Sequence, residues 1–256
     1  MKTTLPLLAA AIVVGLIGPA QARSLATIRS FGTLGLCAHP NSLPFASKAN
    51  DPPGFQVELG KALAHELGVE LKLDWIITQY QMRSADCDIV LDVIADREAQ
   101  GETNLAISKP YYRTGVTLAV PSDSKLASFK GLDEHTKVGV QVGSVAAMVI
   151  GQRHVPTSTF GFEVDSLEAL ANRELDAAAV TPTIAAYYNQ AHPDKAFRIL
   201  PLDDSETALS WNVAVGMLRP DKELREAVDG ALERLHADGT IDRIYGRYGV
   251  TLQSPK

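Results

Sequence analysis

Strand-like and helix-like patterns alternate along most of this chain of 256 residues. A β-type run from Thr33 ends at Cys37 and is followed by a loop rich in turn-forming residues, His39 to Pro53. From Phe55 to Leu67 the apolar residues recur at helical spacing, and a glycine ends the pattern. Strands that alternate with helices are typical of a parallel sheet covered by helices, so we expect an α/β fold.

A second set of strands and helices follows a polar linker. The β-type run Val116 to Val120 ends at residues 121–124, whose composition is typical of a hinge. Two α/β units of about 100 to 130 residues would each be large enough to bury a core. Periodicity beyond the linker predicts strand 137–142, helix 166–173, strand 177–180, helix 183–190, strands 197–201 and 212–217, helix 222–237 and a shorter helix that extends to Tyr248.

Composition and motif content exclude several classes of protein. With 46% hydrophobic and 21% charged residues the chain is globular rather than disordered. Its net charge is -6 and no basic tract interrupts it, so we expect no nucleic-acid partner. The six histidines lack metal-ligand spacing, and GxSxG, HExxH, Walker and GxGxxG motifs are absent. We therefore expect no enzyme, no metal and no cofactor.

The first 22 residues have the pattern of a secretory signal peptide. Lys2 precedes an apolar run from Leu5 to Ile17, and Ala20-Gln21-Ala22 supplies the small-x-small triplet of a cleavage site. The alternative is a membrane anchor, but the run is shorter than the roughly 20 residues that span a bilayer. We expect cleavage after Ala22 and a monomeric protein of the periplasm that is free of the membrane.

The two cysteines, Cys37 and Cys87, each lie in or beside a β-type run. In an oxidising compartment, two cysteines without CxxC spacing form a disulfide more often than they bind a metal. If the runs 33–38 and 87–93 are neighbours in a parallel sheet, the sulfur atoms can meet, and we expect a disulfide. Two buried free thiols are the alternative.

Four motifs in order resemble the type II periplasmic solute-binding proteins, known as bacterial extracellular solute-binding proteins of family 3. They are the stretch 43–69, Ser108-Lys109-Pro110-Tyr111-Tyr112, the stretch 137–144 and the stretch 237–249. The resemblance implies two lobes, each a mostly parallel sheet flanked by helices, joined by two crossing segments. Lobe 1 would comprise residues 23–118 and 218–256, and lobe 2 residues 119–217. A ligand would lie between the lobes, and closure would be a hinge motion.

A narrower resemblance links the stretches 37–45, 87–90 and 109–113 to one branch of this family, the MxaJ and XoxJ proteins of methanol oxidation. It implies a protein that assists or activates a quinoprotein (PQQ-dependent) methanol dehydrogenase, with a peptide segment or small molecule in its cleft. The segment 75–86 is shorter than is usual in that branch, and Asp92 replaces a common glycine. The alternative is a solute receptor of an ABC transporter that binds an amino acid or a small organic acid. A dehydratase-like enzyme with Glu58 or Glu102 as its base is a third, weaker interpretation.

The resemblance also supplies candidate residues for the cleft. Amino-acid binders of this fold hold the ligand carboxylate with an arginine of the first lobe, for which Arg97 is the candidate. The family's Thr-x-x-Arg pattern is absent here, which favours an Arg97 that is solvated or paired with Asp96 or Glu98. Gly143 and Ser144 would begin a helix whose first N–H groups attract a carboxylate, or Ser144 would simply be its N-cap. The other candidates are the aromatic residues Phe45, Tyr80, Tyr111 and Tyr112, then Arg113, and Asp203, Asp204 and Glu206 as acids for an ammonium group.

Overall fold

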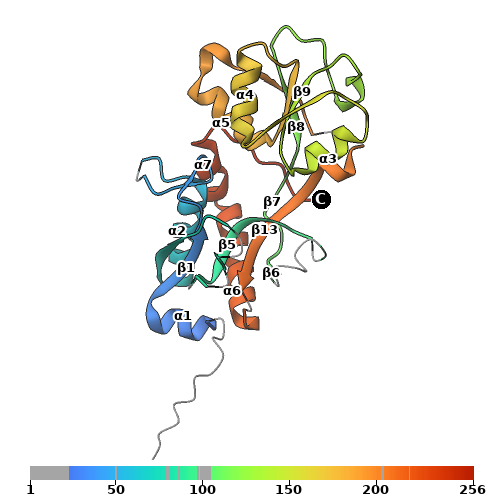
Figure 1. Cartoon of the computed structure of the whole chain (residues 1–256). Coiled ribbons are helices and arrows are strands. Elements are labelled where there is room, and N and C mark those ends of the chain that lie inside the picture. Colours follow the sequence, from blue (N-terminus) through green and yellow to red (C-terminus); the bar gives the residue numbers. More distant parts are fainter. Residues whose placement is uncertain are drawn as a thin grey trace, which may run out of the picture.

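The computed structural model describes residues 23–256 except 50, 79–80, 83, 86, 97, 99–104, 203–204 and 219. The described chain forms two α/β lobes joined by crossing strands (Figure 1). Among the described helices, none combines the length and the apolar character needed to cross a bilayer. The predicted signal peptide lies outside the described residues, as do Tyr80, Arg97, Glu102, Asp203 and Asp204.

Lobe 1 is built around a six-stranded mixed sheet of order β4-β1-β5-β13-β6, with β7 also paired to β13. β1 runs parallel to β4 and β5, whereas β13 runs antiparallel to β5, β6 and β7. The helices of this lobe share one core with the sheet. Its elements are α1 (Leu25–Phe31), β1 (Thr33–Ala38), the hairpin β2 (Asn41–Ser42) and β3 (Ala46–Ser47), α2 (Phe55–Leu67), β4 (Glu70–Trp75), β5 (Ile89–Ile94), β6 (Leu105–Ile107), β7 (Tyr112–Gly115), β13 (Ser210–Leu218), α6 (Lys222–Ala237) and α7 (Thr240–Gly246).

Lobe 2 has a five-stranded sheet of order β10-β9-β11-β8-β12 in which β9, β10 and β11 are parallel and β8 is antiparallel to β11 and β12. One helix, α3, packs on one face of this sheet, and α4 and α5 pack on the other (Figure 1). Its elements are β8 (Thr117–Val120), β9 (Val138–Gln141), α3 (Val145–Gly151), β10 (Thr157–Phe160), α4 (Glu163–Ala171), β11 (Ala177–Val180), α5 (Pro182–Ala191), β12 (Arg198–Ile199) and the 3-10 turns Phe129–Gly131, Pro193–Lys195 and Thr207–Leu209.

The sequence patterns predict α2, α6 and β11 with the bounds that the structure has. In α2 the apolar stripe is buried, with Phe55, Leu59 and Leu63 inaccessible to solvent, and the helix ends at Gly68 in the left-handed conformation. α4 begins earlier than predicted, at Glu163. Its first turn is mostly polar, so its apolar periodicity starts only after the helix itself has begun.

The crossing strand β13 belongs to the sheet of lobe 1, which corrects the expected boundary between the lobes. The expected lobe 2 of residues 119–217 includes almost all of this strand, but β13 pairs with β5 from Val213 to Met217 and with β6 and β7. Its antiparallel course also makes the sheet mixed rather than mostly parallel. The apolar run of β13 is buried in the core of lobe 1, which a pattern of local residues does not reveal.

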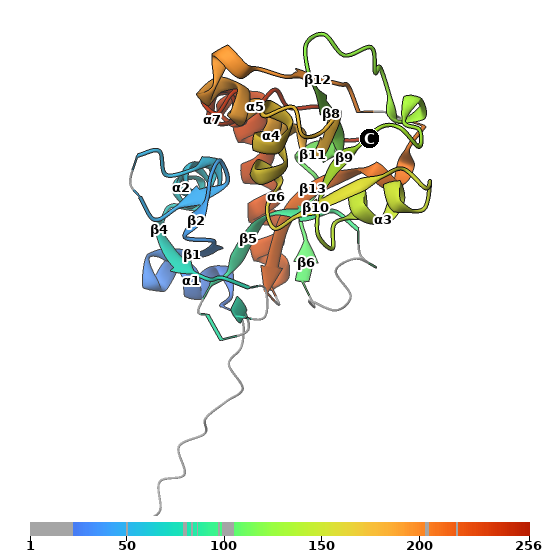
Figure 2. The ribbon, with the colours of Figure 1, turned by 45° about the horizontal axis from the view of Figure 1, so that its top comes forward.

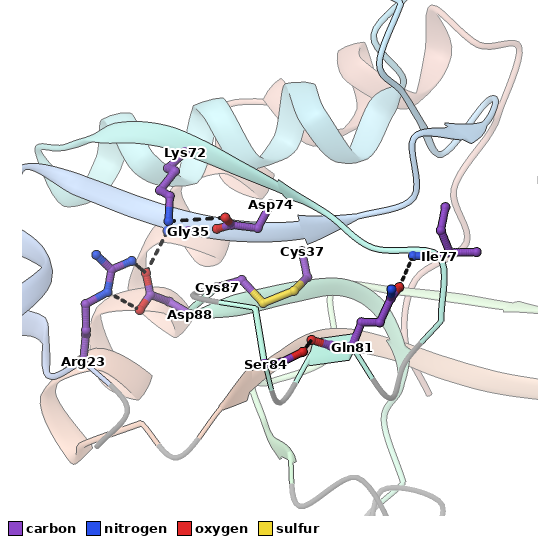
Figure 3. The surroundings of a disulfide bond; sticks show 10 residues. All are labelled: Arg23, Gly35, Cys37, Lys72, Asp74, Ile77, Gln81, Ser84, Cys87 and Asp88. Atoms are coloured by element: carbon purple, nitrogen blue, oxygen red, sulfur yellow. Dashed lines mark hydrogen bonds and ion pairs between the residues drawn. A yellow bond between two sulfur atoms is a disulfide. The ribbon is translucent and has the colours of Figure 1, made fainter. Parts of the chain in front are cut away.

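The predicted disulfide between Cys37 and Cys87 is confirmed (Figure 3). Cys37 lies in β1 and Cys87 just before β5, and these strands are parallel neighbours. Beside the bond, Arg23 donates to both carboxylate oxygens of Asp88 at 3.0 and 2.6 Å, and Asp88 also accepts from the backbone N–H of Gly35 at 2.7 Å. The disulfide and this ion pair together fasten the start of the described chain to the centre of the sheet.

We predict that replacing both cysteines by serine lowers the free energy of unfolding by about 2–4 kcal/mol, because the bond closes a loop between residues 50 positions apart. Urea denaturation of the wild type and the double variant, each with and without dithiothreitol, measures the effect. Reductant should destabilise the wild type alone. Equal midpoints for the oxidised wild type and the double variant would contradict the prediction.

The C-terminal residues lie against the crossing strands (Figure 1). Arg113 of β7 donates its backbone N–H to the carbonyl of Gln253 at 2.8 Å. The side-chain amide of Asn212, the residue paired with Arg113 in β13, both donates to and accepts from the backbone of Lys256. Trp211, the preceding residue of β13, packs against the cores of both lobes. The tail therefore braces the segments that connect the lobes.

We expect deletion of residues 253–256 to lower the free energy of unfolding by about 1–2 kcal/mol, since it removes three hydrogen bonds to the crossing strands. Thermal unfolding followed by circular dichroism checks this. Asn212→Ala, which removes two of the three bonds without shortening the chain, should give part of the loss. An unchanged melting temperature in both variants would show that the C-terminal residues do not stabilise the fold.

Candidate functional site

In lobe 2 the carboxyl ends of the parallel strands lie toward lobe 1. β7 is part of the first sheet, and β8 begins two residues after its end, at Thr117, so the amino end of β8 lies beside lobe 1. β11 is antiparallel to β8, with Val180 opposite Thr117, so the carboxyl end of β11 lies there too. β9 and β10 run in the direction of β11 and end at the same edge.

In lobe 1 the corresponding edge lies toward lobe 2. β13 leaves lobe 2 at Ser210, which pairs with Gly115, and it places Val213 opposite Ile94 at the carboxyl end of β5. β1 is parallel to β5 and ends at the same edge. Open α/β sheets bind ligands outside the carboxyl ends of their strands. The space between these two facing edges is therefore the candidate site.

On the lobe 1 side, this edge is organised around the carboxylate of Asp92 in β5. Its Oδ1 accepts from the hydroxyls of Tyr111, Tyr112 and Tyr245 at 2.9, 3.0 and 2.9 Å, and its Oδ2 accepts from the amide of Gln56 at 2.7 Å. These partners come from β7, α7 and the start of α2. One carboxylate thus joins β5 to three other elements of the lobe.

The electrostatics of this cluster follow from its burial. Burial raises the pKa of Asp92, and the hydrogen bonds from Gln56 and the three tyrosines act in the opposite direction. Burial and then the negative charge of Asp92 raise the pKa of Tyr111, Tyr112 and Tyr245 well above its usual value, so these hydroxyls stay protonated donors. Asp92 has a φ of 57°, a region that favours glycine and that aspartate tolerates. This conformation explains why an aspartate can occupy a position at which glycine is common.

We predict that Asp92→Ala lowers the free energy of unfolding by about 2–4 kcal/mol, because three buried hydroxyls lose their acceptor. Asp92→Asn should cost less, and Asp242→Asn, an exposed change on α7, should cost under about 1 kcal/mol. Urea denaturation at pH 7 ranks the variants. Equal stability of Asp92→Ala and wild type would contradict this role.

The raised pKa of Asp92 also predicts a dependence on pH. A carboxyl whose pKa is higher in the folded than in the unfolded chain contributes stability that is fully present below the unfolded pKa and is lost as the pH rises through the folded pKa. The stability of the wild type relative to Asp92→Asn should therefore increase as the pH falls from 7 toward 4. If the stability of the wild type relative to Asp92→Asn stays constant or decreases as the pH falls, burial does not disfavour the charged form of Asp92.

On the lobe 2 side, three loops follow the ends of β9, β10 and β11. We call residues 141–144, 161–163 and 181–183 the interlobe face of lobe 2. Val142 donates its backbone N–H to Phe160 at 2.9 Å, so the loops after β9 and β10 run side by side. Two large apolar side chains here are mostly exposed, Val142 at 65% and Phe162 at 66%. Exposed apolar side chains that gather where two lobes face each other are typical of a binding surface.

The same face carries the carboxylate of Glu163, the first residue of α4. Its Oε2 accepts from the backbone N–H of Thr181 at 3.0 Å and from the Thr181 hydroxyl at 2.8 Å. Thr181 is the N-cap of α5, and α4 packs across β9, β10 and β11. Burial raises the pKa of Glu163, and the bonds from Thr181 act in the opposite direction.

The lobes also meet directly where α5 contacts the residues that follow α7. The amide of Gln190 in α5 donates to the carbonyl of Arg247 at 3.1 Å, and the rings of Tyr187 and Tyr248 lie 6.1 Å apart. A groove of about 410 Å³ between α5 and lobe 1 is lined by these residues and by Glu58, which pairs with Arg247 and accepts from Tyr248. Glu58 is the candidate base of the dehydratase-like interpretation. Its carboxylate is instead held by the guanidinium of Arg247 and the hydroxyl of Tyr248.

Several of the residues proposed for the cleft have structural partners. Tyr111 and Tyr112 are buried in the core of lobe 1 with their hydroxyls on Asp92, and the ring of Tyr112 also packs 5.3 Å from that of Tyr245 in α7. Arg113 is buried and donates to the Ser210 hydroxyl at 2.8 Å. The ring of Phe45 is half-buried against Phe55, 5.0 Å between centroids. These aromatic rings build the edge of lobe 1 rather than an open surface on it.

In lobe 2, Gly143 and Ser144 belong to the loop after β9, which is part of the interlobe face. Ser144 is the N-cap of α3, and its hydroxyl accepts from the backbone N–H of Ala147 at 3.1 Å. Glu206, a candidate acid, pairs with Arg153 at 3.0 Å, so its charge is already compensated. Sequence reasoning missed Glu163, whose only signal is an acid at the start of a helix that follows a β-type run. Within the described part of the chain, no three His, Cys, Asp or Glu side chains gather as a metal ion would require.

Comparison with known proteins is consistent with this two-lobed geometry. Residues 34–251 match the family described as bacterial extracellular solute-binding proteins, family 3. The chain belongs to this family.

Among the relatives, the arginine-binding extracellular protein ArtP of Bacillus subtilis is 27% identical over 212 residues, which cover 78% of this chain and 80% of ArtP. The membrane-bound lytic murein transglycosylase F of Desulfosudis oleivorans is 24% identical over 242 residues, 88% of this chain, which spans only 50% of that longer protein. Among solved structures, an ancestral cationic amino acid solute-binding protein is 25% identical with a TM-score of 0.75, covering 88% of this chain and 99% of the other.

Proposed function

We propose that this protein is a solute receptor outside the cytoplasm, in the periplasm, that binds an amino acid or a similar small molecule between its lobes. The observation that carries the proposal is the arrangement of the two sheets, whose carboxyl-end edges face each other across two crossing strands. A solute that contacts both edges would favour the closed arrangement of the lobes. Delivery to the permease of an ABC transporter would complete the role.

Two further observations support a receptor. The interlobe face of lobe 2 combines exposed apolar side chains with a carboxylate, which suits a small amphipathic solute. The relatives that match over most of their length include an arginine-binding protein, and the cationic amino acid binder shares the fold. We propose no catalytic activity, since Glu58 is occupied by Arg247 and Tyr248.

The second candidate is the accessory role in methanol oxidation that the narrower sequence resemblance suggests. It rests on the stretches 37–45, 87–90 and 109–113. In the structure these stretches contain the disulfide and the two tyrosines Tyr111 and Tyr112, which donate to Asp92 within lobe 1. The comparisons favour the receptor over this interpretation.

We predict that at least one compound from a panel of amino acids and small organic acids raises the melting temperature. One site at a hundredfold excess over Kd stabilises the folded state by about 2.7 kcal/mol. Trp211 lies at the crossing against both cores, so its fluorescence should change with the same compound in a Trp75→Phe variant, where it is the remaining tryptophan. A sugar such as glucose serves as the control.

If no compound of the panel changes either the melting temperature or the Trp211 fluorescence, the receptor function is refuted. Co-purification with a quinoprotein methanol dehydrogenase, tested at two salt concentrations together with dehydrogenase activity, would then decide the accessory role. Association or a change in dehydrogenase activity would support it, and the absence of both would exclude it.

A further inference from the structure

We propose that the contact between α5 and the residues after α7 is a latch that holds the two lobes in an arrangement with an open candidate site. It joins Ala186, Tyr187 and Gln190 of lobe 2 to the segment 247–249 of lobe 1, and we call these residues the interlobe latch. Solute binding would have to release it. The latch itself does not depend on the proposed function, whereas its expected effect on solute affinity rests on that function.

α5 packs on both lobes, with a different face toward each. Ala185 and Tyr188 are buried in a core of lobe 2. Ala186 and Tyr187 pack instead against the core of lobe 1. Residues one position apart do not share a face of a helix, and a surface helix ordinarily packs on its own domain through a single apolar stripe. The second apolar face of α5 is therefore the part of the helix that serves the contact with lobe 1.

The two halves of the latch approach each other at the level of the backbone. The side-chain amide of Gln190 donates to the carbonyl of Arg247 at 3.1 Å. Gly249 has a φ of 74°, and a Cβ at this position would lie 3.2 Å from the carbonyl oxygen of Ala186 and 3.3 Å from Oε1 of Gln190. Only glycine combines this backbone conformation with so close an approach. Because Gly249 already touches α5, rotation of the lobes cannot press the two closer together and has to loosen the contact.

Each half of the latch is fixed to an edge of the candidate site. Tyr248 donates its hydroxyl to Oε1 of Glu58 at 2.7 Å and accepts from the backbone N–H of Gly54 at 2.9 Å, so it is tied to the start of α2. On the other side, α5 begins at its N-cap Thr181, which belongs to the interlobe face of lobe 2. A change in the distance between the two edges is therefore transmitted to the latch.

The latch is formed while the interlobe face of lobe 2 is open. Val142 and Phe162 on this face remain 65% and 66% exposed. Closure over a solute would bury them, which is favourable, but would lose the latch. The latch is small enough to be released, since Gln190 is exposed and a groove of about 410 Å³ between the lobes lies beside it. Its strength therefore sets part of the balance between the open and the closed arrangement.

The experiment measures the arrangement of the lobes without any solute. Nitroxide labels on Glu174→Cys in lobe 2 and Glu223→Cys in lobe 1, both exposed positions, report the distance between the lobes by electron paramagnetic resonance. The native cysteines are bonded to each other and do not react with the label. The latch variants are Gln190→Ala and Tyr187→Ala, and Gln152→Ala is the matched control, because Gln152 is an exposed glutamine of lobe 2 at the end of α3.

We expect one narrow distance distribution in the wild type and in Gln152→Ala, and a broader distribution or a second distance in both latch variants. Calorimetry with L-arginine, L-glutamine and L-glutamate, and with any further compound that raises the melting temperature, measures the effect on affinity. A compound that binds the wild type should bind Gln190→Ala about two- to tenfold more tightly, because the stabilisation of the open arrangement by one hydrogen bond is removed. Its affinity for Gln152→Ala should be unchanged.

Two outcomes would overturn the inference. If both latch variants keep the distance distribution of the wild type, the contact does not hold the lobes. If the distribution changes but a solute binds Gln190→Ala equally or more weakly, the contact does not oppose closure, and the receptor function stands without the latch. If no compound binds the wild type, the receptor function fails, and the distance measurement alone decides the latch. Should Tyr187→Ala not fold, as circular dichroism would show, the exposed change Gln190→Ala decides by itself.

Discussion

The geometry of the candidate site depends on the direction of the strands that cross between the lobes. β7 and β8 lead from lobe 1 to lobe 2 and β13 returns; β8 is antiparallel to β11 of the parallel set in lobe 2, and β13 is antiparallel to β5 of the parallel set in lobe 1. Because an antiparallel partner reverses the direction of the chain, the carboxyl ends of β5 and β11 must both lie at the junction. Any solute held between the lobes therefore meets the loops that follow the parallel strands of both sheets.

Each edge of the site contains a half-buried carboxylate that is used in a different way. Asp92 accepts four side-chain hydrogen bonds from three neighbouring elements, so it organises lobe 1 from within. Glu163 is held by Thr181 through one oxygen. A charge removed from water is costly unless it is hydrogen-bonded, and both carboxylates receive such bonds.

The disulfide and the C-terminal tail restrict motion at opposite ends of lobe 1. The Cys37–Cys87 bond links β1 to the residue segment just before its neighbour β5 (both strands are labelled in Figure 2), beside the Arg23–Asp88 ion pair (Figure 3). The tail instead lies on the crossing strands through Gln253 and Lys256. Trp211, in the returning strand, contacts the cores of both lobes.

Local patterns in the sequence determined the α/β class, the bounds of α2, α6 and β11, and the family, because amphipathic periodicity and glycine stops act over a few residues. The disulfide could also be foreseen, since it needs only that β1 and β5 be neighbours. Only the tertiary structure decided that β13 joins the sheet of lobe 1, that Tyr111 and Tyr112 turn inward to Asp92, and that Glu163 meets Thr181. Each of these contacts joins residues that are far enough apart in sequence that strand direction and helix packing, rather than local spacing, bring them together.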